Sequence, residues 1–286
     1  MTSRTIRKIT QAPTSRHGTG LLTRDVTEEV MGTDMDPFIV VSLYEMAGPT
    51  FPPHPHAGFS VATYILPESP IGFINQDSIG HRNIISPGSL HVTLAGSGVL
   101  HEEQPQRAGS LAIGFQIWID HANGTRASKP SAISLDRANV PVQVKDGATI
   151  RAVLGTSNEV QSPLTLPTAI RIIDVGLEPH ATFIQALEVS ENAFLIMIAG
   201  SGLANGHEVQ AGEVVRTAAD GRSLQVTGGN EGARFTLFAG EPFQQARAQR
   251  GPMVASDERE LRQFMTAYSQ GKMGTIIPFS QQSSAT

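Results

Sequence analysis

Short runs rich in β-branched and aromatic residues recur along the first part of the chain. They occupy residues 38–44, 59–66 and 111–119, and turn-forming sequences such as those at 86–88 and 95–98 lie between them. Apolar runs of this length, bounded by Gly, Pro, Asn and Ser, are typical of strands joined by tight turns. This part of the chain is therefore predicted to form an all-β sandwich or barrel.

A second series of apolar runs follows with the same rhythm. It comprises residues 170–175, 193–200, 213–215 and 234–240. Between the two series the chain is polar from Asp120 to about Lys145 and contains glycine and proline, which makes this stretch a candidate linker. The repeated rhythm indicates an internal structural duplication, and we expect domains at 1–135 and 136–286.

One helix is predicted near the end of the chain. Ser256 can cap it, Asp257 and Glu258 favour its positive terminus, and Gly271 supplies a stop. Its apolar stripe comprises Leu261, Phe264, Met265 and Tyr268. We expect this helix to pack against a barrel wall and to carry no chemistry.

Composition narrows the function classes. The 286 residues include 26 acidic and 21 basic residues, for a formal net charge of -5, and no Lys/Arg cluster offers the phosphate-binding surface of a nucleic-acid binder. The absence of cysteine excludes disulfides, thiolate ligands and a cysteine nucleophile. The N-terminus is polar and no apolar run has membrane-spanning length, so we expect a cytoplasmic protein without membrane contact.

Two pairs of candidate ligands carry the strongest chemical signal. His54 and His56 are separated by one residue, as are His101 and Glu103. Alternate side chains of a strand point to the same face, so each pair projects two donors in one direction. Three imidazoles and one carboxylate suit a first-row transition metal, with Fe(II) as a natural occupant, although the same donors bind Zn, Mn, Ni, Co or Cu.

The alternative is that these histidines only satisfy local hydrogen bonds on the surface or in the core. Two histidines at this spacing occur by chance in many proteins, so the first pair alone is weak evidence. The second pair favours a metal site, and five of the nine histidines lie between residues 54 and 101.

Several motifs resemble the pirin family within the cupin superfamily. They occupy residues 51–59, 77–81, 87–90, 95–103 and 115–118. The resemblance implies two tandem cupin β-barrels, with the metal in the N-terminal barrel held by residues matching His54, His56, His101 and Glu103. The second barrel is expected to hold no metal. Pirins are usually described as Fe(II) proteins; several are quercetin 2,3-dioxygenases, and others are regulatory partners.

The chain departs from the pirin pattern near the expected site. Ser60 stands where pirins usually have Glu, Ala57 replaces a common Arg, and His91 falls where pirins usually carry Gln. These changes predict an altered pocket. His91 could extend the ligand set, but we favour a strand histidine that is hydrogen-bonded beside the pocket.

Other residues near the motifs are assigned smaller roles. Gln116 and Phe59 are candidate pocket residues, although Gln116 could equally lie against neighbouring strands. His81 is interpreted as a turn or rim residue and Asp77 as a turn acceptor. The remaining histidines, which have no partner at ligand spacing, are interpreted as surface or structural residues: His17, His121, His180 and His207.

The function that the resemblance implies is a non-haem Fe(II) dioxygenase that acts with O2 on a flavonol or related aromatic substrate. In this hypothesis Glu103 ligates the metal and also takes the hydroxyl proton of the substrate. The alternative is a non-enzymatic iron or redox sensor that binds a protein partner. A barrel with a relic site is less favoured, because all four donors are retained.

Overall fold

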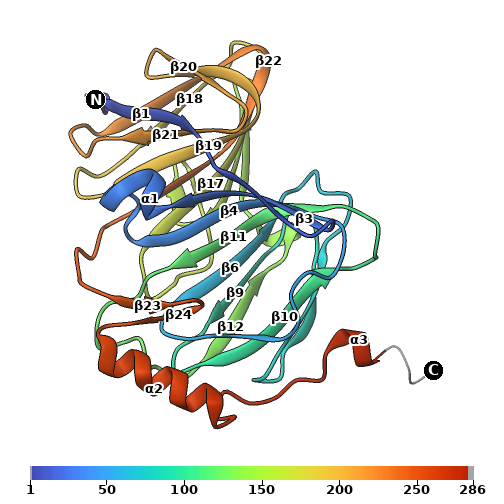
Figure 1. Cartoon of the computed structure of the whole chain (residues 1–286). Helices are drawn as coiled ribbons and strands as arrows, with labels where there is room; N and C mark the ends of the chain where they lie inside the picture. The colour runs from blue at the N-terminus through green and yellow to red at the C-terminus, as the bar shows by residue number, and fades with distance from the viewer. Residues whose placement is uncertain (1, 283–286) are drawn as a thin grey trace. The chain divides into compact units, whose positions relative to one another are not determined.

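The computed structural model describes residues 2–282 (Figure 1). The chain forms two compact units, which we call the first and second barrel units. The first comprises Thr14–Thr23, Val40–Arg137 and the chain from Gln245 onward. The second comprises the chain up to Pro13, Arg24–Ile39 and Ala138–Gln244. None of the helices in the described part of the chain has the length and apolar character that crossing a membrane requires.

The expected domain boundary at 135/136 lies close to one boundary between the units, which falls between Arg137 and Ala138. The terminal segments differ from the prediction. The N-terminal strand β1 (Ile6–Gln11) pairs with β21 (Glu213–Thr217) of the second unit, whereas the chain from Gln245 onward belongs to the first unit. This pairing joins residues that are far apart in the sequence, so the local composition of either segment does not predict it.

The predicted linker is also wrong in part. Within residues 120–145 lie β12 (Ser131–Leu135), which pairs with residues 90–94, and β13 (Val142–Lys145), which pairs with residues 148–151. Both are edge strands, so many of their side chains stay in water and their sequences are polar. Polar composition therefore concealed two strands.

The described part of the first unit is built mainly on two sheets. One has seven strands in the order β12-β9-β6-β11-β4-β3-β2, and the other has four in the order β5-β10-β7-β8. The strands not yet introduced are β2 (Thr14–His17), β3 (Leu21–Thr27), β4 (Phe38–Met46), β5 (His54–His56), β6 (Ser60–Ile65), β7 (Phe73–Asp77), β8 (Arg82–Ile85), β9 (Leu90–Leu94), β10 (Val99–Pro105) and β11 (Ala112–Ile119). An apolar core joins the sheets, with Tyr44 stacked on Phe73 at 5.2 Å between ring centroids.

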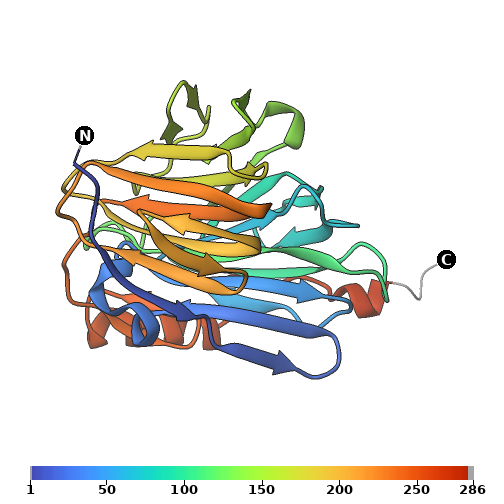
Figure 2. The same ribbon diagram turned by 90° about the horizontal axis from the view of Figure 1, so that it is seen from above.

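The second unit is built on a nine-stranded antiparallel sheet. Its main order is β1-β21-β19-β22-β17-β14-β13, with β18 beside β22 and β20 beside β19. Figure 2 shows its yellow and orange strands side by side, with the dark blue β1 along them. The new strands are β14 (Ala148–Leu154), β17 (Ile170–Leu177), β18 (Thr182–Ala186), β19 (Asn192–Ala204), β20 (His207–Gln210) and β22 (Ser223–Gly240).

Shorter elements complete both units. The second contains α1 (Glu28–Met31), a 3-10 turn at Gly32–Met35, and the hairpin of β15 (Thr156–Ser157) and β16 (Val160–Gln161); another 3-10 turn lies at Arg137–Asn139. The first contains the hairpin of β23 (Ala248–Arg250) and β24 (Met253–Ala255), then α2 (Glu258–Ser269) and α3 (Phe279–Gln282).

Helix α2 confirms the predicted helix but corrects its cap. Asp257 is the N-cap, and its Oδ1 accepts a hydrogen bond from the Glu260 N–H at 2.8 Å. The Ser256 N–H donates instead to the Glu260 carboxylate at 2.7 Å. Of the predicted stripe, Leu261 and Phe264 are buried in a cluster that includes Ala57 and Met253 of the same unit, whereas Tyr268 is exposed.

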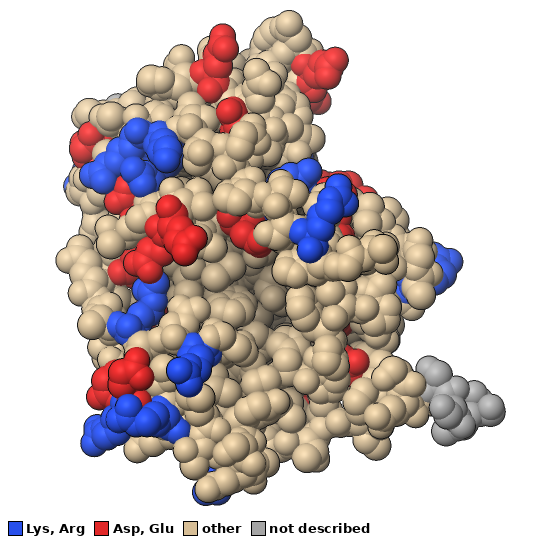
Figure 3. Space-filling view, viewed as in Figure 1, with Lys and Arg blue, Asp and Glu red and all other residues tan. Residues whose placement is uncertain are grey.

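The charged side chains are interspersed on the face that Figure 3 displays. Lys and Arg lie beside Asp and Glu there, and no continuous basic surface is visible on that face. This agrees with the acidic net charge and with the absence of Lys/Arg clusters from the sequence.

Candidate metal centre

Strands β5 and β10 bring the two predicted ligand pairs together. They pair antiparallel, with His101 opposite His54 and Val99 opposite His56. The His101 Nε2 lies 2.9 Å from the His56 Nε2 and 3.1 Å from the His54 Nε2. One ligand atom from each histidine lies within 4.8 Å of the other two. Three imidazoles from two separate segments therefore converge on one point.

The spacing of the three nitrogens fits a metal ion. With metal–nitrogen bonds of about 2.1 Å, two donors at right angles lie about 3.0 Å apart, whereas tetrahedral donors lie about 3.4 Å apart. The separations of 2.9 and 3.1 Å match the first arrangement. Three imidazole ligands would leave further coordination positions of a metal ion open for other ligands.

The hydrogen bond of the His54 ring also fits metal binding. The His54 Nδ1 lies 3.0 Å from the Pro52 carbonyl oxygen, which can only accept, so Nδ1 carries the proton and Nε2 presents a lone pair. One proton on the His101 Nε2 cannot satisfy both neighbouring nitrogens. A cation at the point of convergence would satisfy all three lone pairs together.

Burial keeps these histidines in the form that binds metals. Desolvation lowers the pKa of His54, and it lowers the pKa values of His56 and His101 well below the ordinary value. Repulsion between neighbouring imidazolium charges adds to the effect at His56 and His101. The rings are therefore neutral at pH 7, as ligation requires.

Aromatic side chains hold the imidazoles in place. Phe59 is fully buried, and its ring centroid lies 5.5 Å from that of His56 in an edge-on arrangement. Trp118 packs against both, at 5.7 Å from His56 and 4.7 Å from Phe59. The structure therefore places Phe59, expected to line a pocket, as a support behind a histidine ring.

Glu103 lies outside the group of three histidines. Its carboxylate is buried, and its Oε2 accepts a hydrogen bond from the Thr63 hydroxyl at 2.8 Å. Burial raises its pKa to about 7, although the bond from Thr63 lowers it in part. The expectation that Glu103 is a fourth ligand therefore stays a prediction, while its ability to accept a proton near neutral pH follows from its surroundings.

His91 and Gln116 lie on the same face of the sheet as Thr63. In the strand register Thr63 is opposite both His91 on β9 and Gln116 on β11. The His91 Nδ1 lies 2.9 Å from the Ser134 hydroxyl and its Nε2 lies 3.3 Å from the Asn75 amide nitrogen. This agrees with a hydrogen-bonded strand histidine, and burial lowers its pKa to about 4.

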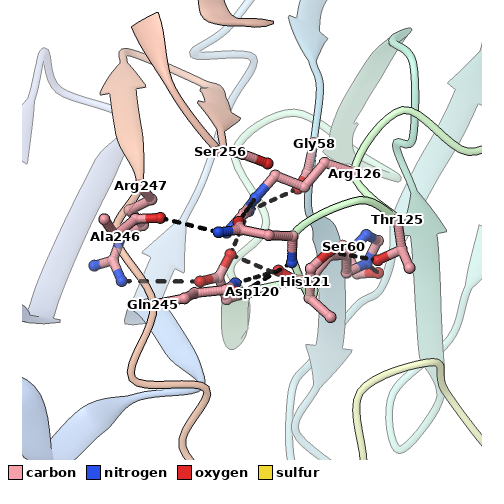
Figure 4. A network of polar contacts seen from close by, with 12 residues as sticks. Gly58, Ser60, Asp120, His121, Thr125, Arg126, Gln245, Ala246, Arg247 and Ser256 are labelled. Carbon is pink, nitrogen blue, oxygen red and sulfur yellow. Dashed lines mark hydrogen bonds and ion pairs between the residues drawn. The ribbon is translucent and has the colours of Figure 1, made fainter.

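Ser60 does not belong to this face, so its assignment as a pocket residue is wrong. Successive strand residues point to opposite sides, and Ser60 is three residues from Thr63 on β6. Its Oγ lies 2.8 Å from the Nε2 of His121, as Figure 4 shows. The alternation of side chains along β6 accounts for this separation.

His121 is a structural residue, as interpreted, but it is buried beside a buried ion pair. Arg126 donates to the Asp120 Oδ1 at 2.5 Å and to the Gly58 carbonyl oxygen at 3.1 Å (Figure 4). The same Asp120 oxygen accepts a hydrogen bond from the His121 N–H. This network fixes the chain next to the β5–β6 turn.

Asp77 is a turn acceptor, as predicted. Its Oδ1 accepts hydrogen bonds from the N–H groups of Ile79 and His81, at 3.0 and 2.9 Å. The His81 ring reaches the other carboxylate oxygen at 2.9 Å, which makes it a rim residue of this turn.

A surface hollow of about 700 Å³ is lined by residues 17–20 and 47–51. Phe51 lines it, is 46% exposed and has its ring centroid 6.0 Å from that of His54 and 6.0 Å from that of His17. The sequence patterns did not identify Phe51, Thr63 or Trp118 as parts of the site. Alternation along β6 and β11 could have indicated Thr63 and Trp118, but only the fold shows which face is inward.

Comparison with known proteins agrees with this architecture. The Pirin family model matches residues 12–119, and the model of the Pirin C-terminal cupin domain matches residues 172–274. A pirin-like protein of Arabidopsis thaliana is 30% identical over 246 residues, which cover 84% of this chain and 89% of that protein.

Two solved structures share the fold. A quercetin 2,3-dioxygenase from Acinetobacter baumannii has a TM-score of 0.87 at 18% identity, covering 96% of this chain and 100% of that chain. A bacterial pirin from Escherichia coli in complex with nickel(II) has a TM-score of 0.65 at 17% identity, covering 82% of this chain and 99% of that chain. The predicted all-β fold of two cupin domains is confirmed, and the chain belongs to the pirin family of the cupin superfamily.

Proposed function

We propose that this protein is a metal-dependent oxygenase of the pirin type, with Fe(II) held by His54, His56 and His101. The substrate would be a flavonol or a related aromatic compound, and O2 would be the second substrate. The observation that carries the proposal is the convergence of three neutral imidazole nitrogens within about one coordination sphere.

Two solved structures of the same fold support this choice. One protein of the same fold is described as a quercetin 2,3-dioxygenase, and another is described as a complex with nickel(II). The first motivates the substrate class and the second motivates metal binding by this fold. Fe(II) is preferred over Zn because Zn(II) is not redox-active, and over Mn, Ni, Co or Cu because the resemblance to pirins implies iron.

A bound Fe(II) ion would supply a redox-active Lewis acid beside the three imidazoles. The surrounding residues have their own tasks. Glu103, with its pKa raised to about 7, would accept the proton of a substrate hydroxyl, and Thr63 would hold its carboxylate in place. The buried ring of Phe59 and the partly buried ring of Trp118 would fix the His56 ring and limit the entry of water.

The test is a turnover assay with quercetin on protein reconstituted with Fe(II). We expect loss of flavonol absorbance in air and release of carbon monoxide, with neither under anaerobic conditions. His56→Ala should abolish both, whereas His207→Ala, which changes an exposed histidine of the second unit, should leave both unchanged. Absence of O2-dependent loss of flavonol absorbance would reject quercetin as the substrate.

The same assay distinguishes an oxygenase from the alternative, a regulatory metal-binding protein. Metal bound at the three histidines without turnover of any compound in a flavonoid panel would favour a regulatory protein. A pull-down whose captured partner changed between Fe(II) and Fe(III) would then support redox sensing.

A further inference from the structure

The segment after α2 returns to the sheet that carries His101. Residues 273–282, which we call the C-terminal strap, run from the end of α2 to α3 along the first unit (Figure 1). Met273 is buried, and its carbonyl oxygen accepts a hydrogen bond from the Ser78 hydroxyl at 2.6 Å. Phe279 is buried as well, and the guanidinium carbon of Arg82 lies 5.4 Å from its ring centroid.

The strap binds the outward face of strand β10. Glu102 lies between His101 and Glu103 on this strand, so its side chain points away from theirs. Its Oε2 nevertheless is buried and accepts two hydrogen bonds, from the Phe279 N–H at 2.9 Å and from the Gln76 amide at 2.7 Å. The strap thus supplies one of the two donors that stabilise a buried carboxylate.

Gln76 completes the attachment. Its amide nitrogen also donates to the Ile277 carbonyl oxygen at 2.8 Å, and its amide oxygen accepts from the Gln282 side chain at 3.0 Å. Gln76 is the register partner of Glu102 on the neighbouring strand β7. The strap is therefore hydrogen-bonded to both members of the cross-strand pair Glu102–Gln76.

This pair is flanked by two pairs that face the barrel interior. His101 is opposite Asp77, and Glu103 is opposite Asn75. On the other side of β10, the edge strand β5 is only three residues long. The pairing of β10 with β7 is therefore the main constraint on where His101 is presented, and the strap acts on the centre of that pairing.

We propose that the C-terminal strap positions β10 for metal binding, so that strap docking and metal binding are thermodynamically coupled. Glu102 and Phe279 are positioning residues, because neither reaches the three imidazole nitrogens. The inference rests on the proposed metal site. Coupling is reciprocal, so a bound metal must also hold the strap more firmly against the sheet.

The first test is titration of the metal-free protein with Co²⁺, whose visible absorption reports coordination. A truncation that lacks residues 276–286 should bind Co²⁺ at least about tenfold more weakly than the full chain, as expected for loss of a supporting contact behind a ligand. The matched control lacks only residues 283–286 and keeps the strap contacts with Glu102 and Gln76; its affinity should be unchanged.

A pair of substitutions isolates the hydrogen bond from the bulk of the strap. Glu102→Leu removes the acceptor for the Phe279 N–H, whereas Glu102→Gln keeps a side-chain oxygen at that place. We expect weakened Co²⁺ binding in the first and substantial recovery in the second. A purely structural role would lower the melting temperature without this difference in metal affinity.

Hydrogen exchange of the full-length protein gives a second measurement that does not depend on any variant folding. Amide exchange within residues 276–282 should slow when Co²⁺ is bound. Equal exchange with and without metal, or equal affinity of a folded truncation and the full chain, would overturn this inference alone. Failure of the full chain to bind Co²⁺ at all would overturn the metal site and the coupling together.

Discussion

At the scale of single residues, the site depends on how burial sets protonation. The three clustered histidines are held neutral by desolvation, while the same burial favours the protonated form of Glu103. A neutral set of ligands thus lies near a group that can gain or lose a proton at about pH 7. Burial thus lowers the pKa values of the candidate ligands and raises the pKa of the candidate base.

The metal-free protein should lose stability on mild acidification. Buried histidines with lowered pKa values stabilise the fold above their ordinary pKa of 6.5, and this stabilisation is lost as the pH falls toward the folded value. For His91 and His121, with folded pKa values of about 4, the loss at pH 5 is about 2 kcal/mol each. The melting temperature should be lower at pH 5 than at pH 7.

Glu103 contributes with the opposite sign. Its raised pKa gives stability that is present below its ordinary value of 4.5 and lost as the pH rises through about 7. The buried histidines outnumber it, so the net trend remains acid lability. A melting temperature that is equal at pH 5 and pH 7 in metal-free protein would contradict burial of neutral histidines.

Thr63→Val should raise the pKa of Glu103 further, because it removes the hydrogen bond from the Thr63 hydroxyl to that carboxylate while keeping the shape of the side chain. The pKa of the acidic limb in the pH profile of flavonol turnover should move to higher pH. Thr93→Val is a matched control, since the Thr93 hydroxyl lies 3.4 Å from the His91 ring and is also buried. Identical pH profiles for both variants would exclude the proposed role of Thr63.

At the scale of elements, residue spacing predicted the cluster of histidines but not which side chains of the neighbouring strands face it. One-residue spacing placed His54 with His56 on one face of β5, and the register with β10 then brought His101 to them. Which face of β6 is inward could not be read from its sequence, because all of its residues are buried. Without a polar side to mark the outside, the sequence did not show that Thr63, and not Ser60, lies on the same face as His91 and Gln116.

Gly58 ties the ligand strand to a distant hairpin. A Cβ atom at Gly58 would lie 1.7 Å from the carbonyl oxygen of Val254, and its φ is +85°. Gly58→Ala should therefore lower the free energy of unfolding by about 3 kcal/mol or more, combining backbone strain with a clash that moves β24. Denaturant unfolding measures this change.

The control for that change is Gly80→Ala. Gly80 also has a positive φ, +101°, but no atom lies within 4 Å of an added Cβ. It should cost only the conformational strain, about 1 kcal/mol. Equal losses for the two variants would show that the approach of Val254 to Gly58 is not a tight constraint.

At the scale of the whole molecule, the repeated apolar runs correctly predicted two β domains in one chain. The ends of the chain were assigned to the wrong units, because their places depend on contacts with residues far along the chain, such as Ile9 opposite Val215 and the Phe279 N–H with Glu102. Local patterns carry no information about such partners. The consequence is functional as well as topological, since the C-terminal strap reaches the strand that presents His101.

The most direct test of the metal centre is the metal content of protein purified without chelator and reconstituted anaerobically with Fe(II). We predict near-stoichiometric iron in the unmodified protein and in His207→Ala, and loss of most of it in His56→Ala or His101→Ala. Elemental analysis of the four proteins in parallel gives the answer. Little iron in the unmodified protein, or equal iron in all four, would contradict a metal centre built from these histidines.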